Sequence, residues 1–112
     1  MIAVIFEAEA LEGQRQAYLD AAAELRPLLA DVPGFIGIER FASLVNPDKV
    51  LSLSYWRDEE SVRQWRNLPA HRSVQAAARD HIFKDYRLRI AAVLREYGMT
   101  DRAQAPEDSR IV

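Results

Sequence analysis

The stretch FIGIERFASLVNPDKVLSLSYW, residues 35–56, decides the fold of this chain. Apolar and polar side chains alternate through both of its halves, which predicts strands over about 35–44 and 50–56. Between them, Asn46 and Pro47 favour a turn. We therefore predict an antiparallel hairpin in the middle of the chain.

The residues before the hairpin predict one strand and one helix. A short apolar segment rich in β-branched residues predicts a strand over about 2–8. Apolar residues then recur at i, i+3, i+4 and i+7 spacing over 11–32, which predicts an amphipathic helix. Pro27 lies within the apolar stripe and should bend this helix or split it near its end, because proline removes a backbone hydrogen bond.

The residues after the hairpin predict a broken helix and a final strand. Asp58 is expected to cap a helix that runs to about residue 67, and Pro69 should begin a second helical piece that ends near residue 78. Alternating side chains then predict a strand over 86–98. The order β-α-β-β-α-β is the ferredoxin-like plan, an α+β fold with a four-stranded antiparallel sheet and helices on one face.

Length and charge are typical of one soluble globular domain. The chain has 112 residues, which fits a single domain over 1–98 followed by a polar tail over 99–112. We expect this tail to be mobile or to lie across a partner subunit. Basic residues number 15 and acidic residues 17, and no apolar run approaches the ~20 residues of a membrane helix. We therefore expect neither a nucleic acid nor a membrane as a partner.

The sequence also excludes several kinds of chemistry. It contains no cysteine, which excludes disulfides, zinc–thiolate sites, iron–sulfur clusters and cysteine nucleophiles. His71 and His81 do not have a same-face helical spacing, so we expect no metal site built on two histidines. The glycines form no phosphate-binding GxGxxG loop. The first residues carry neither a basic leader nor a cleavage site, so we expect a cytoplasmic location.

The side of the sheet that the helices leave uncovered is expected to be apolar. In the first strand Val4 and Phe6 point to one face while Ala3 and Ile5 point to the other, so both faces carry apolar side chains. Burying apolar area is worth roughly 25 cal/mol per Å². We therefore expect a homodimer that packs sheet against sheet, the alternative being a monomer with a slightly apolar face.

The segment SVRQWRNLPAHRSVQ, residues 61–75, is the candidate site. Trp65 and His71 flank the break at Pro69, and a bent crossover over a sheet leaves room for a cavity beneath it. His71 lies on a mostly apolar helix face, where a histidine is either a core residue with one satisfied nitrogen or a base, donor or axial ligand in a pocket. Trp65 is either a core residue or part of the same pocket.

The stretch SLSYWRDEESVRQWRNLPAHRSVQAAARDHIFKDYRLRIAAVLREYG, residues 52–98, resembles the antibiotic biosynthesis monooxygenase family. The shared features are a hairpin strand that ends in Trp, an acidic helix start, a second Trp, a His-Arg pair and a Tyr-rich final strand. The resemblance covers about residues 1–98. It implies a ferredoxin-like subunit that forms a dimeric α+β barrel, with a pocket between each subunit's sheet and helices.

Two branches of this family have known chemistry, and the resemblance implies different roles in each. One branch degrades haem with a pocket Asn, Trp and axial His; here Phe6 and Glu7 occupy the place of the asparagine, and His71 follows Trp65 too closely. The other branch oxidises aromatic compounds with O2 and neither metal nor flavin. There a polar ring follows the tryptophan at an interval like that from Trp65 to His71, while Ser61 replaces an asparagine.

The resulting functional expectation is a cofactor-independent monooxygenase for a small phenol or quinol. Phe6, Trp56 and Phe83 would line the pocket together with Trp65, although each of them is also an ordinary core residue. His71 would accept the phenolic proton. The alternatives are a non-catalytic dimer that binds a small hydrophobic ligand, and a protein that binds or degrades haem through His71.

Overall fold

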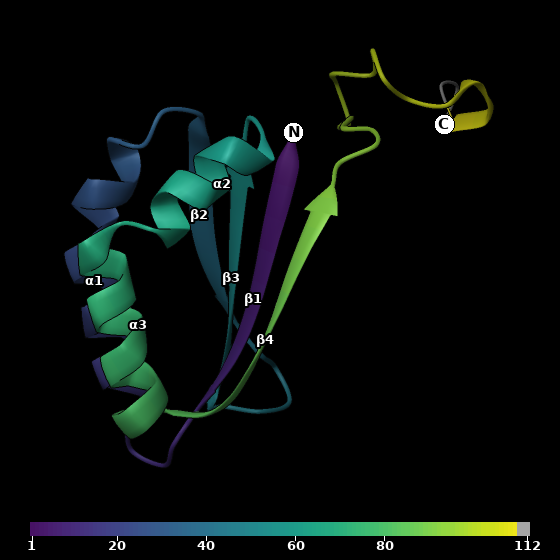
Figure 1. Ribbon diagram of the computed structural model, residues 1–112. Coiled ribbons are helices and arrows are strands. Elements are labelled where there is room, and N and C mark those ends of the chain that lie inside the picture. Colours follow the sequence, from purple (N-terminus) through teal and green to yellow (C-terminus); the bar gives the residue numbers. More distant parts are fainter. Residues whose placement is uncertain (110–112) are drawn as a thin grey trace.

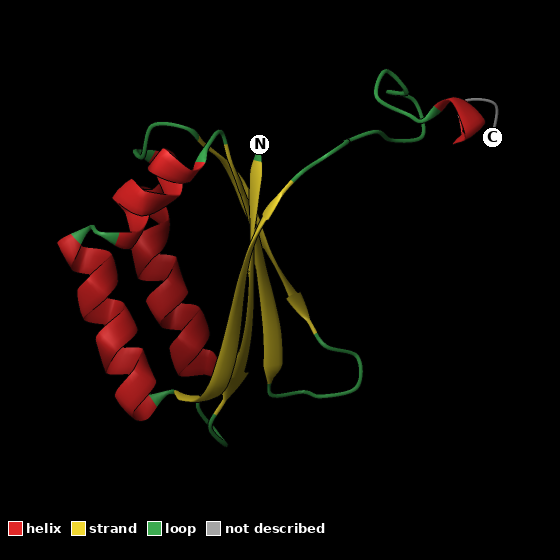
Figure 2. Cartoon of the chain, turned by 45° about the vertical axis from the view of Figure 1, so that its right-hand side comes forward, coloured by secondary structure: helices red, strands yellow, loops and turns green. Residues whose placement is uncertain are grey.

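The computed structural model describes residues 1–109, which form one antiparallel sheet and a layer of helices. The elements are β1 (Ile2–Ala10), α1 (Arg15–Ala30), β2 (Phe35–Ala42), β3 (Lys49–Trp56), α2 (Glu59–Arg66), α3 (Pro69–His81), β4 (Phe83–Ala92) and a short 3₁₀ turn, η1 (Glu107–Ser109). The strand order is β2-β3-β1-β4, and every neighbouring pair is antiparallel (Figure 1). The predicted ferredoxin-like α+β fold is confirmed, with all three α-helices on one face of the sheet (Figure 2).

The first helix is shorter than predicted and Pro27 does not split it. Gly13 takes a positive φ of 79°, which places a turn where the sequence suggested the start of the helix. Pro27 removes the hydrogen bond to the carbonyl of Ala23, and both residues are exposed. The loss therefore falls on the solvent side, where α1 continues for another three residues to Ala30.

The second crossover is broken where the sequence predicted. Asp58 caps α2, and its side chain accepts a hydrogen bond from the backbone N–H of Ser61 at 2.9 Å. This bond, together with contacts from the side chains of Arg57 and Ser61, lowers the pKa of Asp58 to about 2. Leu68 is extended, and Pro69 is the first residue of α3, where a missing N–H costs little.

The last strand begins earlier and ends earlier than predicted. β4 pairs with β1 as far as Ala92, which lies opposite Ile2 at the very start of β1. One more hydrogen bond, from the N–H of Val93 to the carbonyl of Met1, ends the ladder. No residue of β1 remains to pair with 94–98, so the chain leaves the sheet there, and the segment that follows extends away from the helices and sheet (Figure 1).

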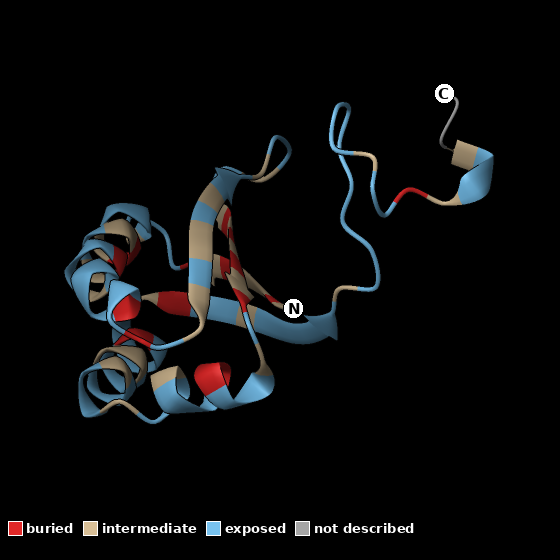
Figure 3. Ribbon diagram, turned by 90° about the horizontal axis from the view of Figure 1, so that it is seen from above, coloured by how far each residue is buried: buried red, intermediate tan, exposed pale blue. Residues whose placement is uncertain are grey.

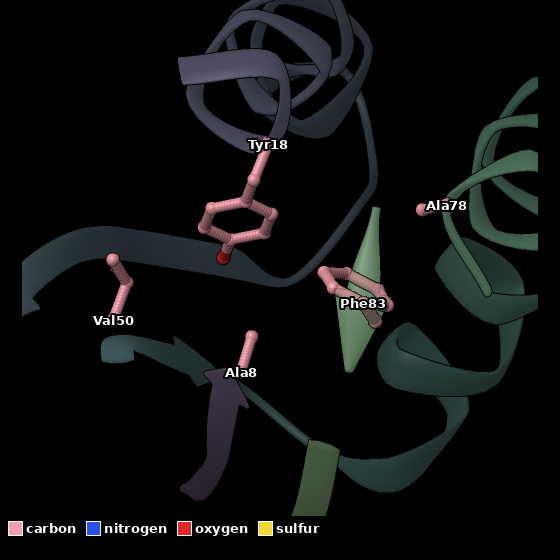
Figure 4. Close-up of a cluster of buried hydrophobic side chains, with 5 residues drawn as sticks. All are labelled: Ala8, Tyr18, Val50, Ala78 and Phe83. Atoms are coloured by element: carbon pink, nitrogen blue, oxygen red, sulfur yellow. The ribbon is translucent and has the colours of Figure 1, made fainter. Parts of the chain in front are cut away.

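The helix-facing side of β3 divides the core into two parts. Its four buried residues follow the order Val50, Ser52, Ser54, Trp56. Val50 belongs to one apolar cluster with Ala8, Tyr18, Ala78 and Phe83, in which the ring of Tyr18 projects from α1 toward the sheet (Figure 4). Trp56 belongs to a second cluster with Leu29, Val32 and Val62. The two serines lie between these clusters, at the middle of the sheet.

Burial follows the layer arrangement (Figure 3). Most buried residues lie where helices and sheet face each other, and the tail beyond β4 is largely exposed apart from the buried Ala105. The helix-free face of the sheet keeps Ile5, Leu51, Leu53 and Tyr55 only partly covered, and Phe41 is 43% exposed. Within residues 1–109, none of the helices has the length and apolar character needed to span a membrane.

Candidate functional site

A cavity of about 670 Å³ lies between the sheet and the helices. Its floor includes Val4, Phe6, Ser52 and Ser54 on the helix-facing side of β1 and β3. Ser52 lies opposite Phe6, and Ser54 lies opposite Val4. Serine is much smaller than the Val and Trp residues before and after this pair on β3, so the middle of the sheet leaves space that the two core clusters do not fill. The volume is within the ~300–1,000 Å³ typical of ligand sites.

The helices roof this cavity with several small residues. Ala21 and Ala22 of α1 and Ala78 of α3 line it, with larger apolar side chains such as Leu25 and Val74 beside them. The alanine side chains are too short to fill the space between the helix backbones and the sheet. The cavity therefore arises from small residues on both layers.

Trp65 and His71 meet at this cavity across the α2–α3 break. Trp65 lies in the last turn of α2 and His71 in the first turn of α3, and both line the cavity. Their ring centroids are 4.6 Å apart with an angle of 36° between the planes. The ring of Trp65 is also 6.5 Å from that of Trp56, so it bridges the second core cluster and the imidazole. The break at Pro69 makes this contact between two helical ends possible.

The electrostatics of His71 favour a neutral imidazole. Its Nδ1 is buried and has no hydrogen-bond partner among residues 1–109. Burial lowers the pKa of His71 below its usual value of 6.5. The backbone of Arg66 raises this pKa, but by less than burial lowers it. The neutral form of the ring is therefore favoured at neutral pH, and a neutral imidazole can act as a hydrogen-bond donor through one nitrogen and an acceptor through the other.

Phe6, Trp56 and Phe83 also line the cavity, in two different settings. Phe6 and Phe83 have ring centroids 5.7 Å apart and belong to an aromatic group at one end of the cavity, which Tyr18 and Tyr86 complete. Trp56 is 1% exposed at the other end. Its Nε1 donates to Ser54 Oγ at 2.9 Å, so the indole N–H already has a partner. These side chains form walls and are packed core residues as well.

Ser61 lies elsewhere. It is 1% exposed and is not among the residues that line the cavity. Its Oγ donates to Asp58 Oδ1 at 2.8 Å, within the cap of α2. It also packs closely against Gly34, where a Cβ would lie 2.0 Å from Ser61 Oγ. The structure gives this serine a role in joining α2 to the start of β2.

Sequence reasoning missed three polar residues on the sheet side of the site. Ser52 and Ser54 line the floor, and Arg40 of β2 joins them from the neighbouring strand, opposite Ser52. The Nε of Arg40 is buried without a hydrogen-bond partner among the described residues. Two serines at alternate positions of an otherwise apolar strand were the available signal, because they share the face of Val50 and Trp56.

The site offers little to a metal ion. Within residues 1–109 no group of three or more His, Asp or Glu side chains is arranged to hold one. Among the described residues, His71 is the only histidine of the cavity lining, and no Asp or Glu lines the cavity. The arrangement is an apolar chamber with an aromatic pair and a few polar atoms.

Comparison with known proteins identifies the family. Residues 1–77 match the profile of the family described as antibiotic biosynthesis monooxygenase. Over 93 residues the chain is 45% identical to a protein of Pyricularia oryzae named jasmonate monooxygenase ABM, covering 83% of this chain and 43% of that protein. Over 95 residues it is 30% identical to the uncharacterized protein YqjZ of Bacillus subtilis, covering 84% of this chain and 80% of that one.

The fold has solved relatives. SnoaB, a cofactor-independent oxygenase from Streptomyces nogalater, superimposes with a TM-score of 0.74 at 13% identity, over 85% of this chain and 94% of that one. At this identity the likeness concerns the fold alone. The chain spans less than half of the P. oryzae protein, so that protein's full length includes residues with no counterpart here. On the match of residues 1–77, the chain belongs to the antibiotic biosynthesis monooxygenase family.

Proposed function

We propose that this chain is a monooxygenase that oxidises a small aromatic substrate of the phenol or quinol type with O2 and without a cofactor. The observation that carries the proposal is the buried, unpartnered Nδ1 of His71 beside Trp65 in a cavity of about 670 Å³. An apolar chamber of this size accommodates one or two fused rings. Family membership supports the same reaction class.

The first step is removal of the substrate's hydroxyl proton. A neutral imidazole accepts this proton, and the lowered pKa of His71 keeps the ring in the neutral form at physiological pH. The phenolate that results is far more easily oxidised than the phenol. Trp65 would stack against the substrate ring and help to hold it against His71.

The second step is the reaction with oxygen, in which the substrate supplies all the electrons. The phenolate passes one electron to O2, and the phenoxyl radical and superoxide combine to form a carbon–oxygen bond. The imidazolium of His71 returns its proton to the resulting peroxide, and loss of water then gives a quinone, so that phenol and O2 become quinone and water. The apolar walls around Phe6 and Phe83 would limit the access of water to the radical pair.

The P. oryzae relative suggests a second substrate to test. That protein is named for jasmonate, which is not aromatic. Jasmonate is therefore the natural second compound in any assay of this chain, alongside simple quinols. If the chain oxidised jasmonate but no quinol, the proposed aromatic substrate would be wrong and the proposed monooxygenase activity would be right.

Oxygen uptake with 1,4-dihydroxynaphthalene tests the proposal, with enzyme-free autoxidation subtracted. We expect saturable uptake in the wild type and a loss of at least a hundredfold in His71→Gln, because general-base catalysis typically contributes about 10²–10⁴-fold. Ser73→Leu is the matched control, since Ser73 is exposed on the same helix and does not line the cavity. Unchanged uptake in His71→Gln would remove His71 from the mechanism.

Two measurements separate the alternatives. Saturable binding of naphthols without oxygen uptake would favour a non-catalytic ligand-binding protein. Titration with haem, followed by its Soret band, would favour haem binding if the wild type shifts the band and His71→Gln does not. His71 is the histidine of the cavity that such ligation would use.

We propose that the chain, in addition to its substrate, binds a second copy of itself to form a homodimer. Ile5, Leu51, Leu53 and Tyr55 lie on the helix-free face, and their neighbour Phe41 is 43% exposed. Contact between two such faces would cover apolar surface that each sheet otherwise leaves to water. In this arrangement the cavities of the two subunits remain separate, each beneath its own helices.

A further inference from the structure

The charged residues around the cavity are all of one sign. Arg40, Arg66, Arg72 and Arg79 line it together with His71, and no Asp or Glu does so among the described residues. The chain as a whole has more acidic than basic residues, 17 against 15. A cavity lined by four arginines and no carboxylate therefore departs from the composition of the rest of the molecule, and its field favours anions.

Arg40 is the arginine within the sheet. It lies on β2 and points to the helix-facing side, because its cross-strand neighbour Ser52 also lines the floor. The adjacent Glu39 points to the other face of the sheet, so it does not neutralise Arg40 from within the cavity.

The guanidinium of Arg40 is left without a protein partner. Its Nε is buried, and the side chain of Arg40 makes no hydrogen bond or ion pair within residues 1–109. A buried donor without an acceptor is costly, and most such groups in folded proteins have a partner. A ligand bound in the cavity could supply the hydrogen-bond acceptor that the protein does not provide for Arg40.

We infer that the cavity takes an organic carboxylate: an apolar ring system that carries one carboxylate, which Arg40 binds. This inference deepens the proposed function and rests on it, since it assigns the class of compound that occupies the same cavity. The carboxylate would lie at the β2 side of the floor, and the ring would occupy the apolar space toward the helices that carry Trp65 and His71. A planar guanidinium and a carboxylate pair through two parallel hydrogen bonds.

The other three arginines have a different part. Arg66, Arg72 and Arg79 are exposed on α2 and α3, at the solvent side of the cavity lining. Arg72 also donates a hydrogen bond to the side-chain carbonyl of Asn67. Exposed charges of one sign at an opening attract oppositely charged ligands and raise their association rate. They favour entry of an anion, whereas Arg40 holds it.

A matched pair of ligands tests this assignment. The probes are 2-naphthoate and 2-naphthamide, which share the ring and the planar head group and differ in charge. Isothermal titration calorimetry measures both against the wild type, Arg40→Met, Arg40→Lys and Arg15→Met. Methionine keeps the length and apolar stem of Arg40, lysine keeps its charge, and Arg15 is an exposed arginine outside the cavity lining.

We expect the wild type and Arg15→Met to bind naphthoate at least tenfold more tightly than naphthamide. In Arg40→Met the two affinities should agree within twofold, and Arg40→Lys should keep part of the preference because its charge remains. Equal affinities in the wild type would overturn the inference even if Arg40→Met fails to fold. A preference that survives intact in Arg40→Met would overturn the role of Arg40.

The outcome for the proposed function is separable. Oxygen uptake with neutral 1,4-dihydroxynaphthalene does not depend on a carboxylate. The monooxygenase proposal can therefore hold even if the wild type does not prefer naphthoate. If neither naphthyl probe binds at millimolar concentration, the inference is overturned, and oxygen uptake then decides separately whether the monooxygenase proposal stands.

Discussion

The imidazole of His71 packs against the indole of Trp65 with ring centroids 4.6 Å apart, although the two side chains come from different helices. The contact depends on the extended Leu68 and on Pro69, which end one helix and begin the next. It covers one face of the imidazole with an apolar ring, and Nδ1 of the same imidazole is buried without a hydrogen-bond partner within residues 1–109. The protonation of His71 therefore connects the local packing with stability and with the catalysis proposed above.

The first prediction concerns the pH dependence of the rate. A base must be neutral to accept a proton, and burial lowers the pKa of His71 below 6.5. Initial oxygen-uptake rates should therefore be flat between about pH 7 and 8 and should fall only on the acid side of about pH 6.5. In His71→Gln the remaining rate should lack this acid limb. An acid limb centred at or above pH 6.5 in the wild type would contradict the assignment.

The second prediction concerns the pH dependence of the free energy of unfolding. Because the pKa of His71 is lower in the folded chain than the ordinary 6.5, the unfolded chain binds more protons just below that pH. The free energy of unfolding should therefore fall as pH falls below about 6.5, until the folded-state pKa is passed. One group contributes at most about 1.4 kcal/mol per pH unit. Urea unfolding between pH 5.5 and 7.5 should give a smaller slope for His71→Gln.

The third prediction concerns the packing of Gly34 against Ser61. Gly34 has a φ of 88°, and an added Cβ would lie 2.0 Å from Ser61 Oγ. Gly34→Ala should lower the free energy of unfolding by about 2 kcal/mol or more, since it adds a steric clash to an unfavourable backbone conformation. Urea unfolding measures this change.

Two other glycines serve as controls for this experiment. Gly13 has a φ of 79° with nothing within 4 Å of an added Cβ, so Gly13→Ala should show the backbone cost alone, about 1 kcal/mol. Gly37 has neither constraint, and Gly37→Ala should be nearly neutral. Equal losses at Gly13 and Gly34 would mean that the contact with Ser61 contributes nothing.

The fourth prediction concerns the serines that open the cavity. Ser52→Leu places an apolar side chain in the floor between the two core clusters. Binding of 2-naphthol, measured by calorimetry, should weaken at least tenfold, while the free energy of unfolding should hold or rise because the side chain fills a void. Ser73→Leu, on the exposed side of α3, should bind as the wild type does. Full binding by Ser52→Leu would place the ligand elsewhere.

The fifth prediction concerns self-association. Leu53 lies between Ile5 and Glu39 on the helix-free face, near the middle of the proposed contact between sheets. Sedimentation velocity should give a dimer for the wild type at micromolar concentration and a monomer for Leu53→Arg, since a buried unpaired charge opposes association. Leu28→Arg, on an exposed position of α1, should remain dimeric. A monomeric wild type would overturn the dimer.

Much of the fold could be predicted from local patterns. The hairpin, the cap at Asp58 and the break at Pro69 all depend on nearest neighbours in sequence, and the structure confirms each of them. The end of β4 could not be predicted in this way. Alternation continues past Ala92, but β1 begins at Ile2, and the length of a strand depends on a partner that is far away in the sequence.

The site was predictable in part for a related reason. Trp65 and His71 are close in sequence, so their spacing around a proline indicated a shared location. Ser61 has an equally suggestive place in the sequence, but the cap of α2 turns its side chain toward Asp58. Arg40 gave no local signal, because its importance comes from the absence of partners, which only the assembled sheet and helices determine.

The serines of β3 have a practical consequence for finding the substrate. Because they keep the two core clusters apart, a molecule that fills the gap would touch both and join them. Such a guest stabilises the native chain in proportion to the logarithm of its concentration over its dissociation constant. A rise in melting temperature across a compound library would therefore rank candidate substrates without any knowledge of the product, and would do so equally well for an inactive variant.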